Sequence, residues 1–245
     1  MIYFIDDLYQ RSYGMWIMTT IFRLDASIRD TGSVTRSIAD GLQASLVAGL
    51  GTSSITRREI GLSPLPSTAW AGAVFGPHVP PEQRTAQQVE GIALANELAD
   101  ELVAADAYIF AVPFYNFGVS QHFKAYVDIL LAEPRFAPGS TPVIAGRPAQ
   151  LVTARGGGYG PGSPRYGWDH GTAWYRRVLE DIWQLDLEVI ECELTLADVT
   201  PAMEGLRGLA AENLSNAHAA AQHNGSSLAR RLAASPLIDL AARAR

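Results

Sequence analysis

Short apolar runs alternate along the chain with longer segments of helical periodicity. The apolar runs predict strands at residues 20–25, 54–60, 107–112, 149–153 and 185–192. Between them, apolar residues recur every three to four positions, which predicts helices at residues 34–48, 82–105, 119–131, 168–183 and 201–223. Strands that alternate with helices in this way indicate an α/β domain built on a doubly wound, five-stranded parallel sheet.

The aromatic turn, residues 113–118 (PFYNFG), follows the run at 107–112, which is almost wholly apolar and predicts a strand buried on both faces. A turn between such a strand and a helix lies at the carboxyl edge of the sheet, where α/β proteins bind ligands. Adjacent aromatic rings and an amide are suited to hold a flat ring. The alternative is an ordinary connection whose aromatic residues belong to the core. The candidate binding residues are Phe114, Tyr115, Asn116 and Phe117.

The serine loop, residues 26–35 (ASIRDTGSVT), joins the first predicted strand to the first predicted helix. Ser33 stands where a helix N-cap belongs. Free N–H groups in a helix's first turn, with hydroxyl groups beside them, bind anions such as phosphate. The loop has no Walker lysine and no G-x-G-x-x-G pattern, so neither of those nucleotide-binding motifs is supported. Taken alone, these residues are explained more simply by a plain N-cap and a polar loop.

The glycine loop, residues 154–162 (ARGGGYGPG), follows the fourth predicted strand. Glycine lets the backbone approach a ligand closely and point its N–H groups toward it. A flexible loop without chemical function is the alternative. Its position after a buried strand, like that of the serine loop and the aromatic turn, favours a binding role.

Two further features concern the middle of the chain. Residues 61–81 contain five prolines and little periodicity, which predicts a long irregular loop. Its Trp70 and Phe75 are candidates to cover a ring, to fill a subunit interface or simply to anchor the loop. Within the helix predicted at 82–105, Gly91 is expected to mark a break or kink.

Composition limits the function further. A formal net charge of −6, from 19 basic and 25 acidic residues, argues against a nucleic-acid groove. No apolar run is long enough to predict a transmembrane helix, and the N-terminus lacks the basic start and cleavage site of a signal peptide. Cys192 is the single cysteine, and the five histidines have no zinc-binding spacing. We therefore expect a cytoplasmic protein without a metal site.

The two ends of the chain differ from its centre. The first predicted strand begins just after Met18, so residues 1–17 are expected to be an N-terminal extension that packs weakly. The core domain is expected to span residues 18–224. Residues 225–245 combine arginines with a leucine and isoleucine stripe, which predicts a helical tail broken at Pro236.

The segment PFYNFGVSQHFKAYVDILL, residues 113–131, resembles the corresponding segment of FMN-dependent NADH-azoreductases, which belong to the flavodoxin-like quinone oxidoreductases. The similarity extends from about residue 20 to about residue 212 and includes the lead-in ALANELADELVAADAYIFAVP. It implies a flavodoxin-like sheet of order 2-1-3-4-5. In that order the serine loop, the aromatic turn and the glycine loop converge on one crevice.

The resemblance also implies FMN as the cofactor and assigns it a set of residues. The serine loop would bind the phosphate, the aromatic turn would hold the ring near N5, and the glycine loop would contact the N1–C2 carbonyl side. The family often has Gln at the position of Val34 and Ser at that of Ala154, so two side-chain contacts are expected to be missing. The assigned residues are Ser27, Ser33, Val34, Thr35, Phe114, Tyr115, Asn116, Phe117, Ala154, Arg155, Gly156 and Gly157.

The activity that the resemblance implies is a ping-pong reaction. NADH or NADPH passes a hydride to flavin N5 and leaves, and a quinone or azo compound then takes two electrons. No side-chain acid or base is expected, and a homodimer with sites at its interface is implied. The alternatives are a non-catalytic electron carrier of the flavodoxin type and a scaffold that has lost its cofactor.

Overall fold

The computed structural model describes residues 18–234, so the expected extension at 1–17 and the last part of the predicted tail, 235–245, lie outside it. Its strands form one sheet in which every neighbouring pair is parallel, in the order β2-β1-β3-β4-β5. This confirms the predicted fold class and strand order. The strands are β1 (Thr19–Asp25), β2 (Ser53–Glu59), β3 (Ala107–Ala111), β4 (Pro148–Ala154) and β5 (Asp186–Cys192).

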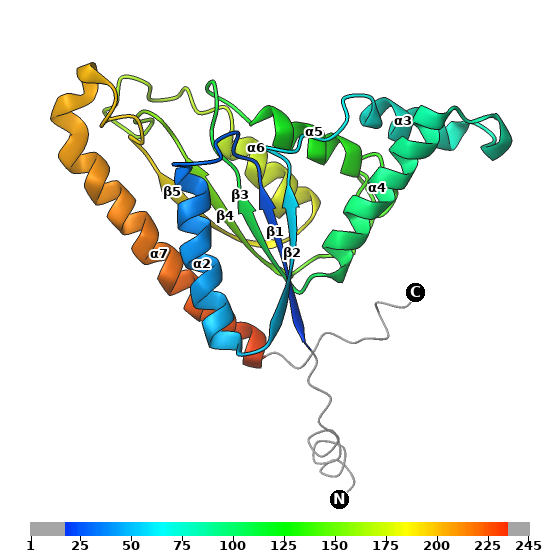
Figure 1. The fold of residues 1–245 in the computed structure, drawn as a ribbon, viewed down its shortest axis with the longest axis horizontal. Helices are drawn as coiled ribbons and strands as arrows, with labels where there is room; N and C mark the ends of the chain where they lie inside the picture. The colour runs from blue at the N-terminus through cyan, green and yellow to red at the C-terminus, as the bar shows by residue number, and fades with distance from the viewer. Residues whose placement is uncertain (1–17, 235–245) are drawn as a thin grey trace, which may run out of the picture.

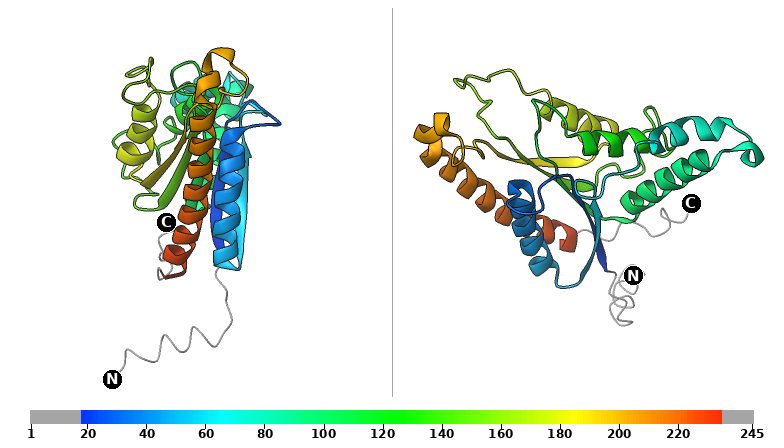
Figure 2. Two further views of the ribbon diagram at one scale, coloured as in Figure 1. Left: turned by 90° about the vertical axis from the view of Figure 1, so that its left-hand side faces the viewer. Right: turned by 45° about the horizontal axis from the view of Figure 1, so that its top comes forward.

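Helices cover both faces of the sheet (Figures 1 and 2). One face is covered by α2 (Val34–Leu50) and α7 (Arg207–Ala234), which lie side by side. The other is covered by α4 (Ala86–Ala104), α5 (Gln121–Leu130) and α6 (Thr172–Arg176). The remaining short elements are α3 (Ala69–Phe75), η1 (Gly76–His78), η2 (Pro81–Gln83), the π-helical turn η3 (Arg177–Ile182) and η4 (Pro201–Leu206).

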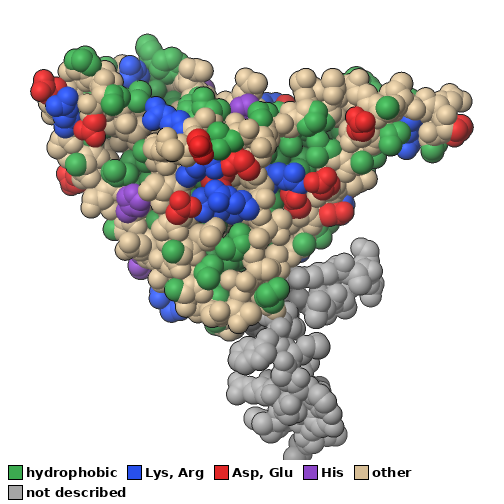
Figure 3. Space-filling view, in the orientation of Figure 1, with side chains coloured by type: hydrophobic (Ala, Val, Ile, Leu, Met, Phe, Trp, Pro, Cys, Tyr) green, Lys and Arg blue, Asp and Glu red, His purple; other side chains and the backbone are tan. Residues whose placement is uncertain are grey.

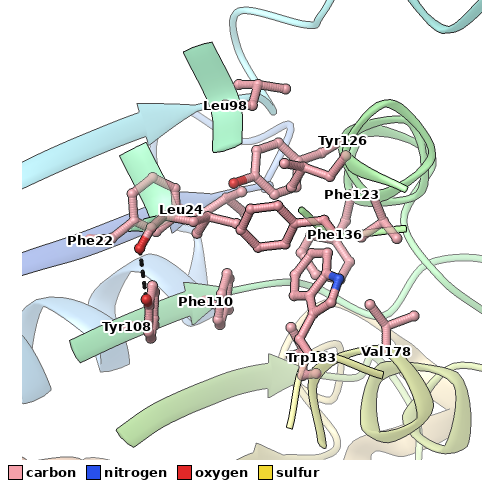
Figure 4. Packing of buried hydrophobic residues seen from close by; sticks show 14 of the residues in the cluster. Phe22, Leu24, Leu98, Tyr108, Phe110, Phe123, Tyr126, Phe136, Val178 and Trp183 are labelled. Carbon is pink, nitrogen blue, oxygen red and sulfur yellow. Dashed lines mark hydrogen bonds between the residues drawn. The ribbon is translucent and has the colours of Figure 1, made fainter. Parts of the chain in front are cut away.

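The two faces of the sheet have different cores, because successive residues of a strand point to opposite faces. On the α4–α5 side, Phe22, Tyr108 and Phe110 from the strands pack with Phe123 of α5 and Trp183 (Figure 4). On the α2–α7 side the core is aliphatic and rich in alanine. The aromatic core is continuous with the strand that leads into the aromatic turn, and it fixes the base of that turn.

The segment 61–81 is not an irregular loop, because it contains the short helix α3. α3 packs closely on α4: a Cβ on Gly72 would lie 2.4 Å from the Gln87 carbonyl oxygen, and one on Gly91 would lie 2.7 Å from that of Ala69. The expected break at Gly91 is also wrong, since α4 runs through it without interruption. Gly91 instead permits two helix backbones to approach.

The C-terminal region differs from the prediction in a similar way. α7 is one helix from Arg207 to Ala234, so the boundary expected between residues 224 and 225 falls inside it. Gly225 and Leu228 are buried against α2, and a Cβ on Gly225 would lie 2.4 Å from the Leu42 carbonyl oxygen. None of the helices in the described region is long and apolar enough to cross a membrane.

Candidate active site

A cavity of about 390 Å³ lies at the carboxyl edge of the sheet, and its volume is in the range of small-molecule sites. The serine loop after β1, the aromatic turn after β3 and the glycine loop after β4 all contribute to its lining. The structure therefore brings together residues that the sequence placed in three separate segments. All the predicted site residues except Arg155 line it: Ser27, Ser33, Val34, Thr35, Phe114, Tyr115, Asn116, Phe117, Ala154, Gly156 and Gly157.

The serine loop forms one end of the cavity. Ser33 is the N-cap of α2, as predicted, and its Oγ accepts a hydrogen bond from the Arg36 N–H. The Thr35 Oγ1 lies 3.2 Å from Ser33 Oγ, and both residues are almost fully buried. Within the described chain, no group accepts a hydrogen bond from the N–H of Val34 or Thr35. Free N–H groups, hydroxyls and a helix N-terminus together form a site for an anion.

Arg36 holds the serine loop from behind. Its guanidinium donates to both carboxylate oxygens of Glu59 and to the Ser27 carbonyl oxygen, the latter at 2.8 Å. The hydrogen bond with Glu59 raises the pKa of Arg36. For Glu59, burial would raise the pKa, but the hydrogen bonds from Arg36 and from the Leu62 N–H hold it below its usual value. Arg36 is thus tied to the protein through both Nη groups, while its Nε is buried without a hydrogen-bond partner among the described residues.

Buried charges surround this contact. Asp25 is inaccessible to solvent and pairs with Arg23 at 3.0 Å and Arg57 at 2.7 Å. In the space-filling view, basic and acidic side chains also gather near the middle of the visible face (Figure 3). The loop after β2 also contacts the serine loop, because a Cβ on Gly61 would lie only 2.1 Å from the Ser27 carbonyl oxygen. Gly61 permits this backbone contact.

The aromatic turn has an unusual backbone. Asn116 and Phe117 have φ of 47° and 67°, in the left-handed region that residues with side chains seldom adopt. Two hydrogen bonds between the Tyr115 and Gly118 backbones close the turn. Strained backbone of this kind costs about 1–3 kcal/mol per residue and is concentrated at functional sites. The N–H groups of Asn116 and Phe117 have no acceptor within residues 18–234.

Aromatic rings line the other end of the cavity. Phe114 packs edge-on against Tyr159 at a ring distance of 5.0 Å, and Phe117 contacts both Tyr159 and Trp168. Phe114 is buried, whereas Phe117 and Trp168 are 42% and 52% exposed. The ring wall therefore extends from the interior to the rim, where a second aromatic molecule can reach it.

The glycine loop lines the cavity through its backbone, while the Arg155 side chain does not reach it. The Arg155 guanidinium is 4% exposed and pairs with Asp169 at 2.8 Å, Glu191 at 2.7 Å and Glu193 at 3.2 Å. Arg155 does not line the cavity, and its predicted role in FMN binding stays a prediction. Arg155 anchors the loop to β5, which leaves Gly156 and Gly157 at the cavity surface.

Sequence reasoning missed several lining residues. Some lie beside predicted ones in the same loops, and Tyr159 could have been found as the aromatic residue of the glycine loop. Others come from the segment after β5, which carries no recognisable pattern; only its position at the carboxyl edge could have indicated it. The missed residues are Arg29, Gly32, Pro113, Tyr159, Arg165, Thr195, Leu196, Thr200 and Met203. Across residues 18–234, no cluster of three or more His, Cys, Asp or Glu side chains could hold a metal ion.

Comparison with known proteins agrees with this geometry. Residues 19–214 match a family model described as a flavodoxin-like fold. An azoreductase from Bacillus anthracis has a similar structure, with a TM-score of 0.70, 17% identity, and 86% of this chain and 100% of that one covered. A second structure, of a B. anthracis FMN-dependent NADH-azoreductase in complex with FMN, has a TM-score of 0.68, 16% identity and coverage of 86% and 100%. The fold and its crevice thus define a flavodoxin-like protein.

Curated proteins of similar sequence show which family of flavodoxin-like proteins the chain belongs to. An FMN-dependent NADH:quinone oxidoreductase of Frankia alni is 37% identical over 188 residues, which is 76% of this chain and 89% of that protein. One from Frankia casuarinae is 35% identical over 208 residues, with 84% and 98% covered. The chain belongs to the family of FMN-dependent NADH:quinone oxidoreductases. The resemblance inferred from the sequence is confirmed.

Proposed function

We propose that the cavity binds FMN and that the protein uses NADH to reduce quinones and azo compounds. The observation that carries this proposal is the joining of two unlike binding surfaces in one cavity. The hydroxyls of Ser33 and Thr35 fit a phosphate, together with the free N–H groups of Val34 and Thr35. The aromatic turn fits a planar ring. The names of the relatives and of the FMN-bound neighbour support the same cofactor.

The residues present divide the binding between them. Ser27, Ser33 and Thr35 supply hydroxyl groups for the phosphate, and Val34 supplies only its N–H. At the ring end, the strained turn presents the N–H groups of Asn116 and Phe117. Ala154 adds no hydroxyl, so the glycine loop binds through its backbone.

FMN, when bound, supplies the hydride and two-electron chemistry of the reaction. The protein orients the ring and leaves one approach open at the exposed ring of Phe117. NADH and the acceptor would use this approach in turn, as in a ping-pong reaction. The described cavity contains no carboxylate or histidine, so its residues bind and position and do not transfer protons through such a group.

Absorbance spectroscopy tests the function directly. Purified protein is expected to be yellow, its flavin band should bleach on addition of NADH, and a quinone should restore the band. A yellow protein that does not bleach would be an electron carrier of the flavodoxin type. A colourless protein that takes up no FMN would be a scaffold without a cofactor, and either result would contradict the proposal.

We also propose that the protein acts as a cytoplasmic homodimer. Trp70 and Phe75 on α3 are 53% and 63% exposed, so an interface over α3 would remove two large apolar side chains from water. A twofold assembly is the commonest symmetric arrangement and would cover them. Light scattering after size exclusion gives the mass in solution, and a monomer would contradict this part of the proposal.

A further inference from the structure

Four arginines lie at or next to the cavity, and they fall into two pairs. Arg36 and Arg155 form ion pairs with carboxylates and do not line the cavity. Arg29 and Arg165 line the cavity, and neither forms an ion pair with any carboxylate of the described chain. Two uncompensated positive charges therefore face the ligand.

The two unpaired arginines belong to different ends of the cavity. Arg29 is part of the serine loop, and its N–H donates to Ser27 Oγ at 3.2 Å. Arg165 lies against the glycine loop, where its Nη1 is 2.2 Å from the position that a Cβ on Gly157 would occupy. The absence of a side chain on Gly157 gives the guanidinium its place at the ring end.

The glycine loop is electropositive even without Arg165. The carbonyl groups of Gly156 and Gly157 accept hydrogen bonds from the Leu196 and Leu194 N–H groups, at 3.2 and 3.3 Å. Their own N–H groups have no acceptor in the described part of the chain. The loop therefore presents donors to the cavity, and the Arg165 guanidinium adds a full positive charge on the same side.

This arrangement matters for the proposed function, on which the following inference rests. A hydride adds two electrons and one proton to a neutral flavin ring, so the reduced ring carries one negative charge until it takes up a second proton. We propose that Arg165 is the positive charge that stabilises the reduced, anionic ring of FMN. It binds the reduced cofactor more tightly than the oxidised one and so raises the reduction potential.

The positive charge of Arg165 acts electrostatically on Tyr159, which also lines the cavity. Burial raises the pKa of the Tyr159 hydroxyl, and the positive charges of Arg165 and Arg155 act in the opposite direction. Because Arg165 is itself exposed, its effect is screened by solvent and should decrease as salt is added. A moderate, salt-dependent contribution is therefore expected.

The test compares Arg165→Gln with Arg29→Gln, using FMN and riboflavin in both redox states. Arg165→Gln should weaken binding of either reduced flavin about tenfold more than that of the oxidised form, which lowers the two-electron potential by about 30 mV. Arg165→Lys keeps the charge and should recover most of the loss. Arg29→Gln should weaken the binding of FMN in both redox states and leave the affinity for riboflavin unchanged, because Arg29 lies at the phosphate end.

Each outcome decides a separate point. An unchanged ratio of oxidised to reduced affinity in Arg165→Gln would overturn the inference. If Arg165→Gln lowered the affinity for FMN but not for riboflavin, Arg165 would act on the phosphate, and the inference would again be overturned. Wild-type protein that binds neither flavin would refute the proposed function and the inference together. A Gly157→Ala variant, whose Cβ displaces the guanidinium, should reproduce part of the shift in potential without removing the charge.

Discussion

The two ends of the cavity are built on opposite principles. At the serine-loop end, the charged groups behind the binding surface are paired and wholly or partly buried, and Arg36, Glu59 and Asp25 hold the loop in one position. At the aromatic end, the backbone is strained, Phe117 is 42% exposed, and Arg165 lines the cavity without an ion pair to any described carboxylate. The first end provides affinity through a preformed site, and the second provides access and charge for the reaction.

The largest effect is expected from removing a phosphate ligand. Ser33→Ala should lower the affinity for FMN roughly 10- to 100-fold, because a hydrogen bond to a charged group contributes about 1.5–3 kcal/mol. The lost helix cap should reduce the free energy of unfolding by only about 1 kcal/mol. Fluorescence titration of FMN measures the first effect, and urea denaturation measures the second.

Riboflavin is the matched control for this variant. It lacks the phosphate, so its affinity should barely change in Ser33→Ala. Ser33→Asp should lower the affinity for FMN more than Ser33→Ala does, since a carboxylate beside the phosphate adds repulsion. Equal losses for the two flavins would show that Ser33 supports the fold and not the phosphate, and the contrast between the two ends would not hold.

A smaller effect is expected from releasing Arg36. Glu59→Gln removes the carboxylate that Arg36 contacts, and at pH 7 it should reduce the free energy of unfolding by about 1–2 kcal/mol, less than for a fully buried pair because Glu59 is partly exposed. Without Glu59 as a partner, Arg36 should hold the Ser27 carbonyl less firmly, and the affinity for FMN should fall a few-fold. Urea denaturation and FMN titration measure the two losses.

The sign of the pH dependence follows from the lowered pKa of Glu59. Its contribution is fully present above the unfolded pKa of about 4.3 and is lost as pH falls through the folded value. The difference between wild type and Glu59→Gln should therefore shrink as pH falls below about 4. Glu97→Gln is the control, because Glu97 pairs with Arg58 at the surface and its loss should cost at most about 0.5 kcal/mol. A constant difference from pH 7 to pH 3 would contradict the assignment.

The smallest change in stability is expected in the aromatic turn. Asn116→Gly relieves left-handed strain but adds freedom to the unfolded chain, so the two terms should cancel to within about 0.5 kcal/mol. Riboflavin affinity should nevertheless fall a few-fold, because the turn is less rigidly preformed. Asn116→Val, which resists a positive φ, should be clearly destabilised in thermal melts. A strongly stabilised glycine variant that binds riboflavin normally would show that the strain has no role in binding.

Much of the fold was predictable because its signals are local. The apolar run at 107–112 is buried on both faces, so its pattern needed no tertiary context. Ser33 was predictable as an N-cap because capping depends on neighbours within one turn. The meeting of the three loops followed from the strand order, which the family resemblance implied and the structure confirms.

The missed features depend on contacts between distant segments. Gly72 and Gly91 are poor helix formers, and only the close contact of α3 with α4 explains them. The direction of the Arg155 side chain is set by three carboxylates, two of them on or just after β5. Thr195 and Met203 line the cavity only because β5 lies next to β4 in the sheet.

Gly61 illustrates how such contacts shape the mutational tolerance of the protein. It does not line the cavity, yet any side chain there would press on the Ser27 carbonyl group, whose backbone cannot yield cheaply. In a library of random substitutions screened for yellow colour, Gly61 should therefore behave like a ligand-binding position. A survey of tolerated residues would place it inside the site, although it does not line the cavity.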